Sequence, residues 1–262
     1  MGDHAVVSRW GRPVAILALS AIAVALAITA PRSVWRSAAG PSPAPTGPVV
    51  NDTPPVVPTT DICRERFGLT CYTPAQIRRA YDLEPLYAKG LDGSGVTIAI
   101  IVEFGSPTIQ RDLAQFDADF GIPAPPSFQI LRPVGDVPPF DRHDERMVGF
   151  AREATLDVEW AHAMAPGAGI LLVETPEVTT SAGGFVNTAD AEGYVIDRGL
   201  ADVVSQSFGW DESLLGKRGL TSLRRAYRNA RDRHVTVVAS SGDDGPVIYE
   251  EGGQFYQNPA VS

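Results

Sequence analysis

The sequence predicts an α/β fold in which one parallel sheet carries helices on both faces. Strand-like and helix-like segments alternate from residue 72 to residue 239, as expected of βαβ units. Residues 95–104, GVTIAIIVEF, form a nearly continuous β-branched run that begins at a glycine. Such a run is typical of a strand buried on both faces of a parallel sheet. A second apolar run, residues 169–174, directly follows Pro166-Gly167.

The other elements are expected in chain order. A short helix over 74–81 has Thr73 as its N-cap, because a threonine oxygen can accept from the first free amides of a helix. The remaining expectations are an amphipathic helix at 108–120, a strand at 128–132, a Pro- and charge-rich loop at 133–150, a carboxylate-bearing helix from 153, a strand at 170–173, a helix at 186–198, a strand at 201–207, a helix at 220–232 and a strand at 235–239.

The first sixty residues are typical of a targeting segment and a tether. Within residues 1–36, Arg9 and Arg12 precede an apolar run from 14 to 30. That run is short for a spanning helix and slightly long for a signal peptide, so a cleaved signal and an uncleaved membrane anchor both fit. Residues 37–60 are rich in Pro, Ser and Thr and predict an extended linker. We therefore expect a domain at 61–262 outside the cytoplasm, secreted or membrane-anchored.

Composition limits the classes of partner. The chain has 262 residues, 44% of them hydrophobic, and a net charge of −9. Residues 1–60 contain four Arg and two Asp, a net charge of +2, so the remainder carries −11. A body this acidic argues against a nucleic acid as partner.

Cys63 and Cys71 are the only two cysteines. After an export signal, an isolated pair most simply forms one disulfide, here at the start of the domain. A metal site would need four ligands, and no histidine lies nearby in the sequence.

The segment that suggests chemistry is EATLDVEWAHAMAPGA, residues 153–168. Glu153 and Asp157 are four residues apart, which on a helix places their Cβ atoms roughly 5–6 Å apart on one face. Two carboxylates so close titrate together, and one can act as a base near acid pH. The alternative is a solvated helix face with scattered acids, which the spacing alone favours.

Several polar groups follow predicted strands. Ligands bind beyond the carboxyl ends of parallel strands. Glu103 lies at the end of the first long predicted strand, Ser207-Phe208-Gly209 at the end of the strand predicted at 201–207, and Ser241-Gly242-Asp243 after the strand predicted at 235–239. We expect these groups to converge at one edge of the sheet, although the register at Glu103 leaves its role open.

Four stretches resemble the sedolisins, the serine-carboxyl peptidases that share the subtilisin fold. CYTPAQIRRAYDL is similar to the start of their catalytic domain, and EATLDVEWAHAMAPGA to the helix with their catalytic Glu and Asp. DVVSQSFG is similar to the strand whose edge pairs with substrate, and ASSGDDG to the loop with the oxyanion Asp. The order and spacing of the four stretches cover roughly residues 61–262.

The resemblance implies a serine-type endopeptidase that acts on peptides or proteins at acid pH. Glu153 would be the general base for a serine hydroxyl, and Asp157 would orient Glu153. Asp243 would be protonated and donate to the oxyanion. Ser207, Phe208 and Gly209 would offer backbone hydrogen bonds to an extended peptide.

The sequence departs from the family pattern in one decisive respect. The family's nucleophile lies in a Gly-Thr-Ser motif after the oxyanion loop, and these 262 residues contain no such motif. We therefore expect a subtilisin-like domain truncated before its nucleophile-bearing half, inactive alone and without a cofactor, since the family's calcium site lies in that other half. His143 and His162 lack the surroundings of a Ser-His-Asp hydrolase.

The alternative function is a non-catalytic pseudopeptidase or peptide-binding module. It would be tethered to a membrane through residues 14–30 if they stay uncleaved.

Overall fold

The computed structural model of the chain describes residues 59–176, 182–209, 212–241, 247–249 and 255–257. The expected targeting segment 1–36, nearly all of the expected linker 37–60, and Asp243 lie outside these ranges. Among the described residues, no helix combines the length and apolar character that a membrane span requires.

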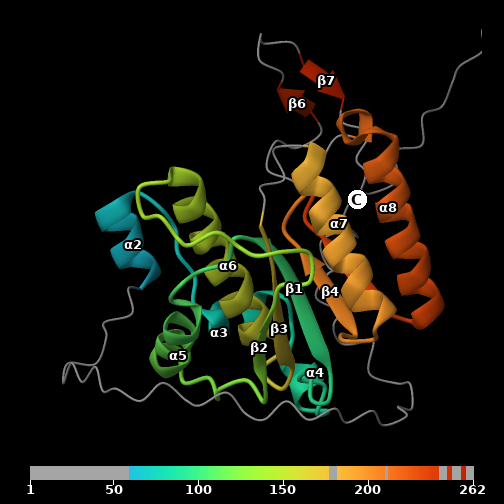
Figure 1. The fold of residues 1–262 in the computed structure, drawn as a ribbon. Coiled ribbons are helices and arrows are strands. Elements are labelled where there is room, and N and C mark those ends of the chain that lie inside the picture. Colours follow the sequence, from blue (N-terminus) through green and yellow to red (C-terminus); the bar gives the residue numbers. More distant parts are fainter. Residues whose placement is uncertain (1–58, 177–181, 210–211, 242–246, 250–254, 258–262) are drawn as a thin grey trace, which may run out of the picture.

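Five parallel strands form the central sheet (Figure 1). Their order across the sheet is β2-β3-β1-β4-β5, and every neighbouring pair is parallel. The strands are β1 (Thr97–Glu103), β2 (Phe128–Leu131), β3 (Gly169–Thr175), β4 (Val203–Gln206) and β5 (Thr236–Ala239). Two further strands, β6 (Val247–Tyr249) and β7 (Phe255–Gln257), pair with each other in antiparallel fashion. The predicted parallel α/β class is confirmed.

Long helices cover both faces of the sheet. α5 (Ile109–Phe120) and α6 (Glu145–Met164) pack on one face, and α7 (Ala182–Asp197) and α8 (Glu212–Arg233) pack on the other. The chain crosses the sheet in opposite directions from β1 to β2 and from β2 to β3, yet α5 and α6 lie on the same face. These two crossovers therefore have opposite hands, and one of them departs from the right-handed rule.

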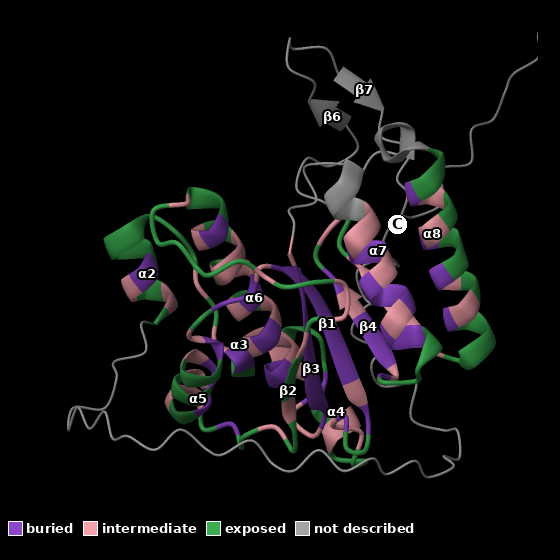
Figure 2. Cartoon of the chain, in the orientation of Figure 1, coloured by how far each residue is buried: buried purple, intermediate pink, exposed green. Residues whose placement is uncertain are grey.

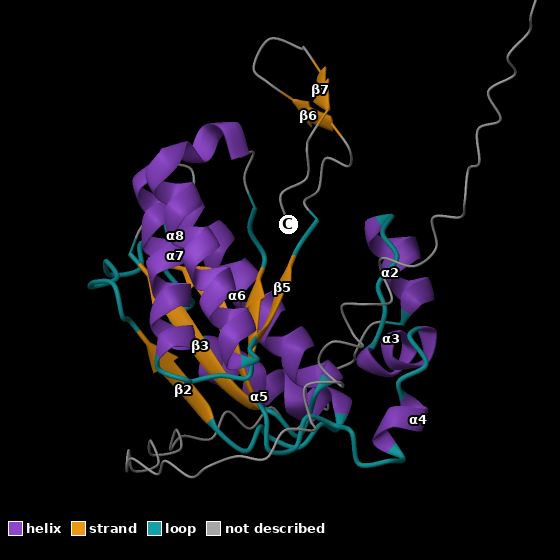
Figure 3. Ribbon diagram, turned by 90° about the vertical axis from the view of Figure 1, so that its right-hand side faces the viewer, coloured by secondary structure: helices purple, strands orange, loops and turns teal. Residues whose placement is uncertain are grey.

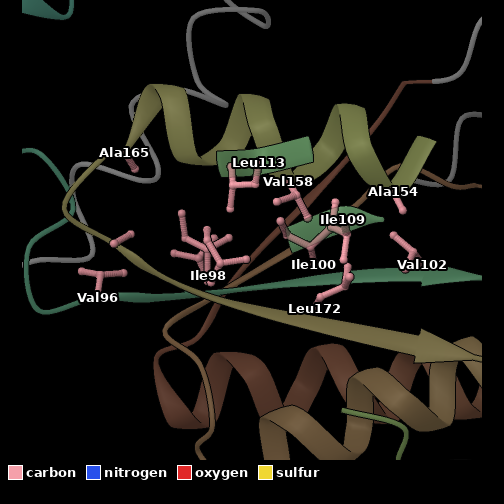
Figure 4. Packing of buried hydrophobic residues seen from close by; sticks show 13 residues of the cluster. Val96, Ile98, Ile100, Val102, Ile109, Leu113, Ala154, Val158, Ala165 and Leu172 are labelled. Carbon is pink, nitrogen blue, oxygen red and sulfur yellow. The ribbon is translucent and has the colours of Figure 1, made fainter. Parts of the chain in front are cut away.

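The alternation of β1 side chains divides the core into two layers. Ile98, Ile100 and Val102 face α5 and α6, whereas Ala99 and Ile101 face α7 and α8. This period of two follows from the pleat of the strand. Figure 4 shows the first layer, in which the α6 side chains lie against β1. Both faces of β1 are therefore buried, as the apolar run predicted.

Three short helices precede the sheet: α2 (Thr60–Phe67), α3 (Pro74–Ala80) and α4 (Glu84–Tyr87). They lie together, away from α7 and α8 (Figure 3). Thr73 caps α3 in a capping box with Gln76, and Cys63 and Cys71 form a disulfide with their Cα atoms 5.9 Å apart.

The same N-terminal segment closes the C-terminal end of α6. Arg78 donates to the carbonyl oxygen of Ala163 at 2.6 and 2.9 Å, and the Tyr87 hydroxyl donates to that of Met164 at 2.7 Å. These carbonyls belong to the last turn of α6, which has no intrahelical donors left.

The prediction of a loop over residues 133–150 is wrong at its C-terminal end, because α6 already begins at Glu145. The Asp144 side chain accepts from the amides of Arg146 and Met147, and this N-cap starts the helix. The Met147 side chain is buried. α7 and α8 also begin earlier than predicted, and α2 and α4 were not predicted at all.

A tight turn after β1 brings the backbone against the buried carboxyl group of an ion pair. Gly105 has a φ of +78°, and a Cβ added there would overlap the Glu174 carboxyl group. Glu174 is only 2% exposed and accepts from Arg132 at 2.7 and 2.8 Å. Gly105 is therefore needed both for its backbone conformation and for the space it leaves.

We expect Gly105→Ala to lower the free energy of unfolding by about 3–5 kcal/mol, because it strains the backbone and displaces Glu174 from Arg132. Gly121→Ala is the matched control, since Gly121 has a φ of +65° but open space around it. The control should lose only about 1–2 kcal/mol. Urea denaturation measures both, and equal losses would show that the overlap with Glu174 is unimportant.

Candidate active site

A cavity of about 330 Å³ lies at the carboxyl ends of β1, β4 and β5, beside α6. Residues from four parts of the chain line it: Ile101, Val102, Glu103, Phe150, Glu153, Asp157, Ser207, Phe208, Gly209 and Ser240. The structure thus brings together the α6 carboxylates, the segment after β4 and the end of β1, at the edge where parallel sheets bind ligands.

The packing of α6 determines where its carboxylates lie. Ala154 and Val158 are fully buried in the core layer under α6. Glu153 and Asp157 each precede one of these residues by one position, so their side chains start at the margin of the buried face. Both are half-buried and line the cavity. The solvated-face alternative therefore does not describe this pair.

The Asp157 carboxyl is strongly affected by its surroundings. Its Oδ1 accepts a hydrogen bond of 2.7 Å from the Ser207 hydroxyl, 50 residues further along the chain. Burial raises the pKa of Asp157 to about 6, the Glu153 charge raises it further, and the Ser207 hydrogen bond lowers it. In acid solution Asp157 therefore carries a proton beside Glu153, as a coupled pair of carboxyls allows.

The segment after β4 presents backbone at the rim of the cavity. Ser207 and Gly209 are exposed, while Phe208 is half-buried and packs on the core layers under α7 and α8. The Ser240 amide donates to the carbonyl of Gln206 at 3.0 Å, which extends the β4–β5 pairing to this point. Phe208 therefore anchors a segment whose two neighbours remain open to solvent.

Glu103 lines the same cavity and is only 3% exposed. The backbone reverses directly after it, with positive φ at both Phe104 and Gly105. The Phe104 ring packs edge-on against that of Phe150, with their centroids 5.9 Å apart. Phe150 was not foreseen as a site residue because the sequence placed it in a loop; the Asp144 N-cap was the available signal that the helix begins earlier.

The other residues that the sequence analysis considered for the site either do not line the cavity or lie outside the described residues. Asp243 is outside the described residues, although Ser240, three positions earlier, lines the cavity. His162 is fully buried, with Nε2 2.9 Å from the carbonyl oxygen of Pro123. His143 is exposed and accepts from Arg142. In the described ranges, no group of three or more ligating side chains is placed to hold a metal ion.

A second hollow, of about 380 Å³, lies between α3, α4, α6 and the strands β4 and β5. Its lining is mostly apolar, including Tyr81, Trp160 and Met164, and Asp92 is its only carboxylate. Because it lacks a pair of interacting acid–base groups, it is a poorer candidate for a catalytic site.

Comparisons with known proteins agree with the geometry. No protein-family model matches the chain. Kumamolisin from Bacillus sp. (strain MN-32) is 32% identical over 200 residues, which are 74% of this chain and 33% of kumamolisin. The chain thus spans about a third of the length of this relative.

Among solved structures, the chain matches that of Pseudomonas sedolisin, a serine-carboxyl proteinase complexed with two molecules of pseudo-iodotyrostatin. The TM-score is 0.52 and the sequence identity 23%, over 67% of this chain and 45% of sedolisin. The sedolisin match shows the shared subtilisin-like fold.

Buried carboxyls elsewhere in the domain share the raised pKa of Asp157. Burial raises the pKa of Asp117 to about 6, that of Glu159 to about 7 and that of Glu192 to about 8. Glu192, on α7, is fully buried, and neither of its carboxyl oxygens has a hydrogen-bond partner among the described residues. These groups favour their neutral forms in the folded protein.

The hydrogen bond from Ser207 can be tested by the titration of Asp157. We expect Ser207→Ala to raise the pKa of Asp157, since a donor to the carboxylate is lost, and Glu153→Gln to lower it, since a neighbouring negative charge is lost. Ser240→Ala, in the same cavity, is the control and should leave it unchanged. Carbon-13 NMR of the carboxyl group measures all three, and shifts of the same sign for the first two would contradict the geometry.

We expect the free energy of unfolding to fall as pH rises from about 4 to 8. A raised carboxyl pKa stabilises the folded state fully below the unfolded pKa, and that contribution is lost as pH rises through the folded value. Burial lowers the pKa of His162, so His162 opposes this trend in acid. Glu192→Gln, which stays neutral, should reduce the fall by about 4 kcal/mol, whereas Glu145→Gln, at an exposed position, should not. Urea denaturation at several pH values measures this, and an unchanged slope in Glu192→Gln would refute it.

Proposed function

This chain is a relative of the sedolisin-family serine-carboxyl peptidases, and from that premise we propose that it supplies the acid–base part of a serine-type endopeptidase working at acid pH. One observation carries the proposal: Glu153 and Asp157 share a cavity with the segment Ser207–Gly209 at the carboxyl ends of the strands. Kumamolisin is 32% identical over 200 residues, which are 74% of this chain.

In the proposed mechanism Glu153 is the general base. It takes the proton from a serine hydroxyl as that oxygen attacks the peptide carbonyl, and later returns it to the leaving amine. Asp157 orients Glu153. Because the pKa of Asp157 is raised to about 6, it carries a proton in acid and can donate to the Glu153 carboxylate.

Substrate binding is assigned to the segment after β4. The exposed backbone at Ser207 and Gly209, anchored by Phe208, would pair with an extended peptide as an added strand. Asp243 would donate to the oxyanion. The nucleophile is proposed to come from outside these 262 residues, since they contain no Gly-Thr-Ser motif. The calcium site of the family is likewise expected elsewhere, so no metal has a role in these steps.

The second candidate function is a non-catalytic peptide-binding module. It is favoured by the same absence of a Gly-Thr-Ser motif. Either product is proposed to act outside the cytoplasm, secreted or held at a membrane through residues 14–30. The two functions differ in one respect only, namely whether Glu153 has a serine to activate.

An acid-range peptidase assay separates the two. The 262-residue chain alone should not hydrolyse peptides, whereas a chain extended by a remainder with the Gly-Thr-Ser motif should be active in acid and lose activity as pH rises past about 6. In the extended chain Glu153→Gln should reduce kcat by about 10²–10⁴-fold, because an amide cannot accept the serine proton. Asp157→Asn should reduce it less, through misorientation of Glu153.

The matched control is Glu145→Gln, in the exposed first turn of the same helix, which should leave kcat unchanged. Turnover by the unextended chain, or an extended chain indifferent to Glu153→Gln, would refute the assignment. An extended chain that binds peptides but cleaves none at any pH would support the peptide-binding module instead.

A further inference from the structure

Helix α8 carries a strongly basic face on an otherwise acidic protein. Residues 217–233 contain seven Lys and Arg and one Asp, a net charge of +6, whereas the whole chain carries −9. All seven cations are exposed. They are Lys217, Arg218, Arg224, Arg225, Arg228, Arg231 and Arg233.

Helical periodicity collects most of these cations on one side. Lys217, Arg224, Arg228 and Arg231 recur at spacings of seven, four and three residues, which is one stripe of an α-helix about 21 Å long. Arg218 and Arg225 flank that stripe. The opposite side of α8, with Leu223, Ala226 and Ala230, is buried against the domain. We call the six cations of the stripe and its flank the basic face; α8 lies at the outside of the domain beside α7 (Figure 2).

Among the described residues, three carboxylates lie along the basic face. Asp190 of α7 lies 3.5 Å from Arg225, and Asp232 lies 2.8 Å from Arg231. Asp197 of α7 accepts from Asn229. Residues 217–233 carry a net charge of +6 with Asp232 included, and adding Asp190 and Asp197 brings it to +4. Like charges at helical spacing repel, so an ordinary solvated helix face would mix the two signs more evenly.

The basic face is also hollowed where α7 and α8 meet. A depression of about 540 Å³ is lined by three cations and two hydroxyl side chains, with Asp190 at its side: Lys217, Arg218, Arg225, Thr221 and Ser222. The hydroxyls are already partly used, because Thr221 donates to the carbonyl of Lys217 and Ser222 to Asp190. The cations remain at its rim, and guanidinium groups suit the oxygens of a phosphate, which they can bind in bidentate fashion.

We propose that the basic face of α8 docks on a lipid bilayer that carries anionic headgroups. The inference is independent of the proposed peptidase function. A straight helix with one exposed basic side offers a flat surface, and a bilayer meets only that side while the acidic remainder stays away from it. No large apolar side chain is exposed along the described part of α8, so the contact would be electrostatic and would not insert into the lipid.

The sequence places the domain within reach of such a surface. If residues 14–30 enter a membrane, the Pro-rich 24-residue linker 37–60 reaches at most about 74 Å as an extended chain, at about 3.1 Å per residue. A tether of this length holds α8 at a high effective concentration near the bilayer. Weak contacts from several Arg side chains then suffice to orient the domain.

Vesicle flotation of the full chain tests the proposal. The readout is the ratio of binding to phosphatidylcholine vesicles with 30% phosphatidylglycerol over binding to pure phosphatidylcholine vesicles, because the apolar segment 14–30 contributes to both. We expect a ratio of about ten or more at 0.1 M salt, falling towards one at 0.5 M as the charges are screened. The combined variant Arg224→Gln, Arg228→Gln and Arg231→Gln should lower it about tenfold.

The control variant neutralises three exposed arginines elsewhere, Arg66→Gln, Arg79→Gln and Arg142→Gln, and should keep the wild-type ratio. Circular dichroism verifies that each variant is folded. If the α8 triple variant unfolds, the proposal is judged instead by the salt dependence of the wild-type binding ratio and by the ratios of the three single variants, each of which should be lower than that of the wild type. A wild-type ratio near one, or equal losses in the two triple variants, would overturn the proposal. Salt-sensitive binding to polyglutamate or DNA without a preference for anionic vesicles would also overturn it, and would assign the basic face to another polyanion.

Discussion

The packing of α6 on β1 and β3 is the contact on which the site depends. Ala154 and Val158 are fully buried against the strands, and this burial fixes the rotation of the helix about its axis. Glu153 and Asp157 then lie at the edge of the buried face. Small side chains at the contact let the helix lie close to the sheet, so that both carboxyls reach the cavity at the strand ends. A rotation of α6 by one position would move them either into the core or out into water, away from the cavity.

Burial is also what gives the carboxyls their chemistry. Desolvation disfavours a charged carboxylate, and it is the main cause of the raised pKa of Asp157, Glu159 and Glu192. At Asp157 this effect acts next to a second carboxyl and a hydroxyl donor, which makes an acid–base pair. At Glu192 it acts on a fully buried carboxyl of α7 that does not line the cavity. In the proposed mechanism this effect has a chemical role at Asp157, whereas at Glu192 it mainly affects stability.

Local patterns in the sequence determined the fold class and much of the site. The β-branched run at 95–104 became β1, which is buried on both faces. A strand that is apolar on both faces removes all of its side chains from water only when it lies between two layers. The spacing of Glu153 and Asp157 specified a shared helix face. The order of the four sedolisin-like stretches placed Ser207 at the end of a predicted strand. These features depend on residues close together in the chain, which is why periodicity and motifs could predict them.

Tertiary structure alone decided how the segments meet. The hydrogen bond from Ser207 to Asp157 joins residues 50 positions apart, and it depends on β4 lying beside β1, which no local pattern encodes. Phe150 reaches the cavity because Asp144 starts α6 earlier than the polar composition of the loop suggested. The unusual hand of one crossover, which places α6 on the same face as α5, is likewise a property of the assembled sheet. Periodicity shows that a helix has a buried side, whereas long-range packing decides against which strands that side is buried.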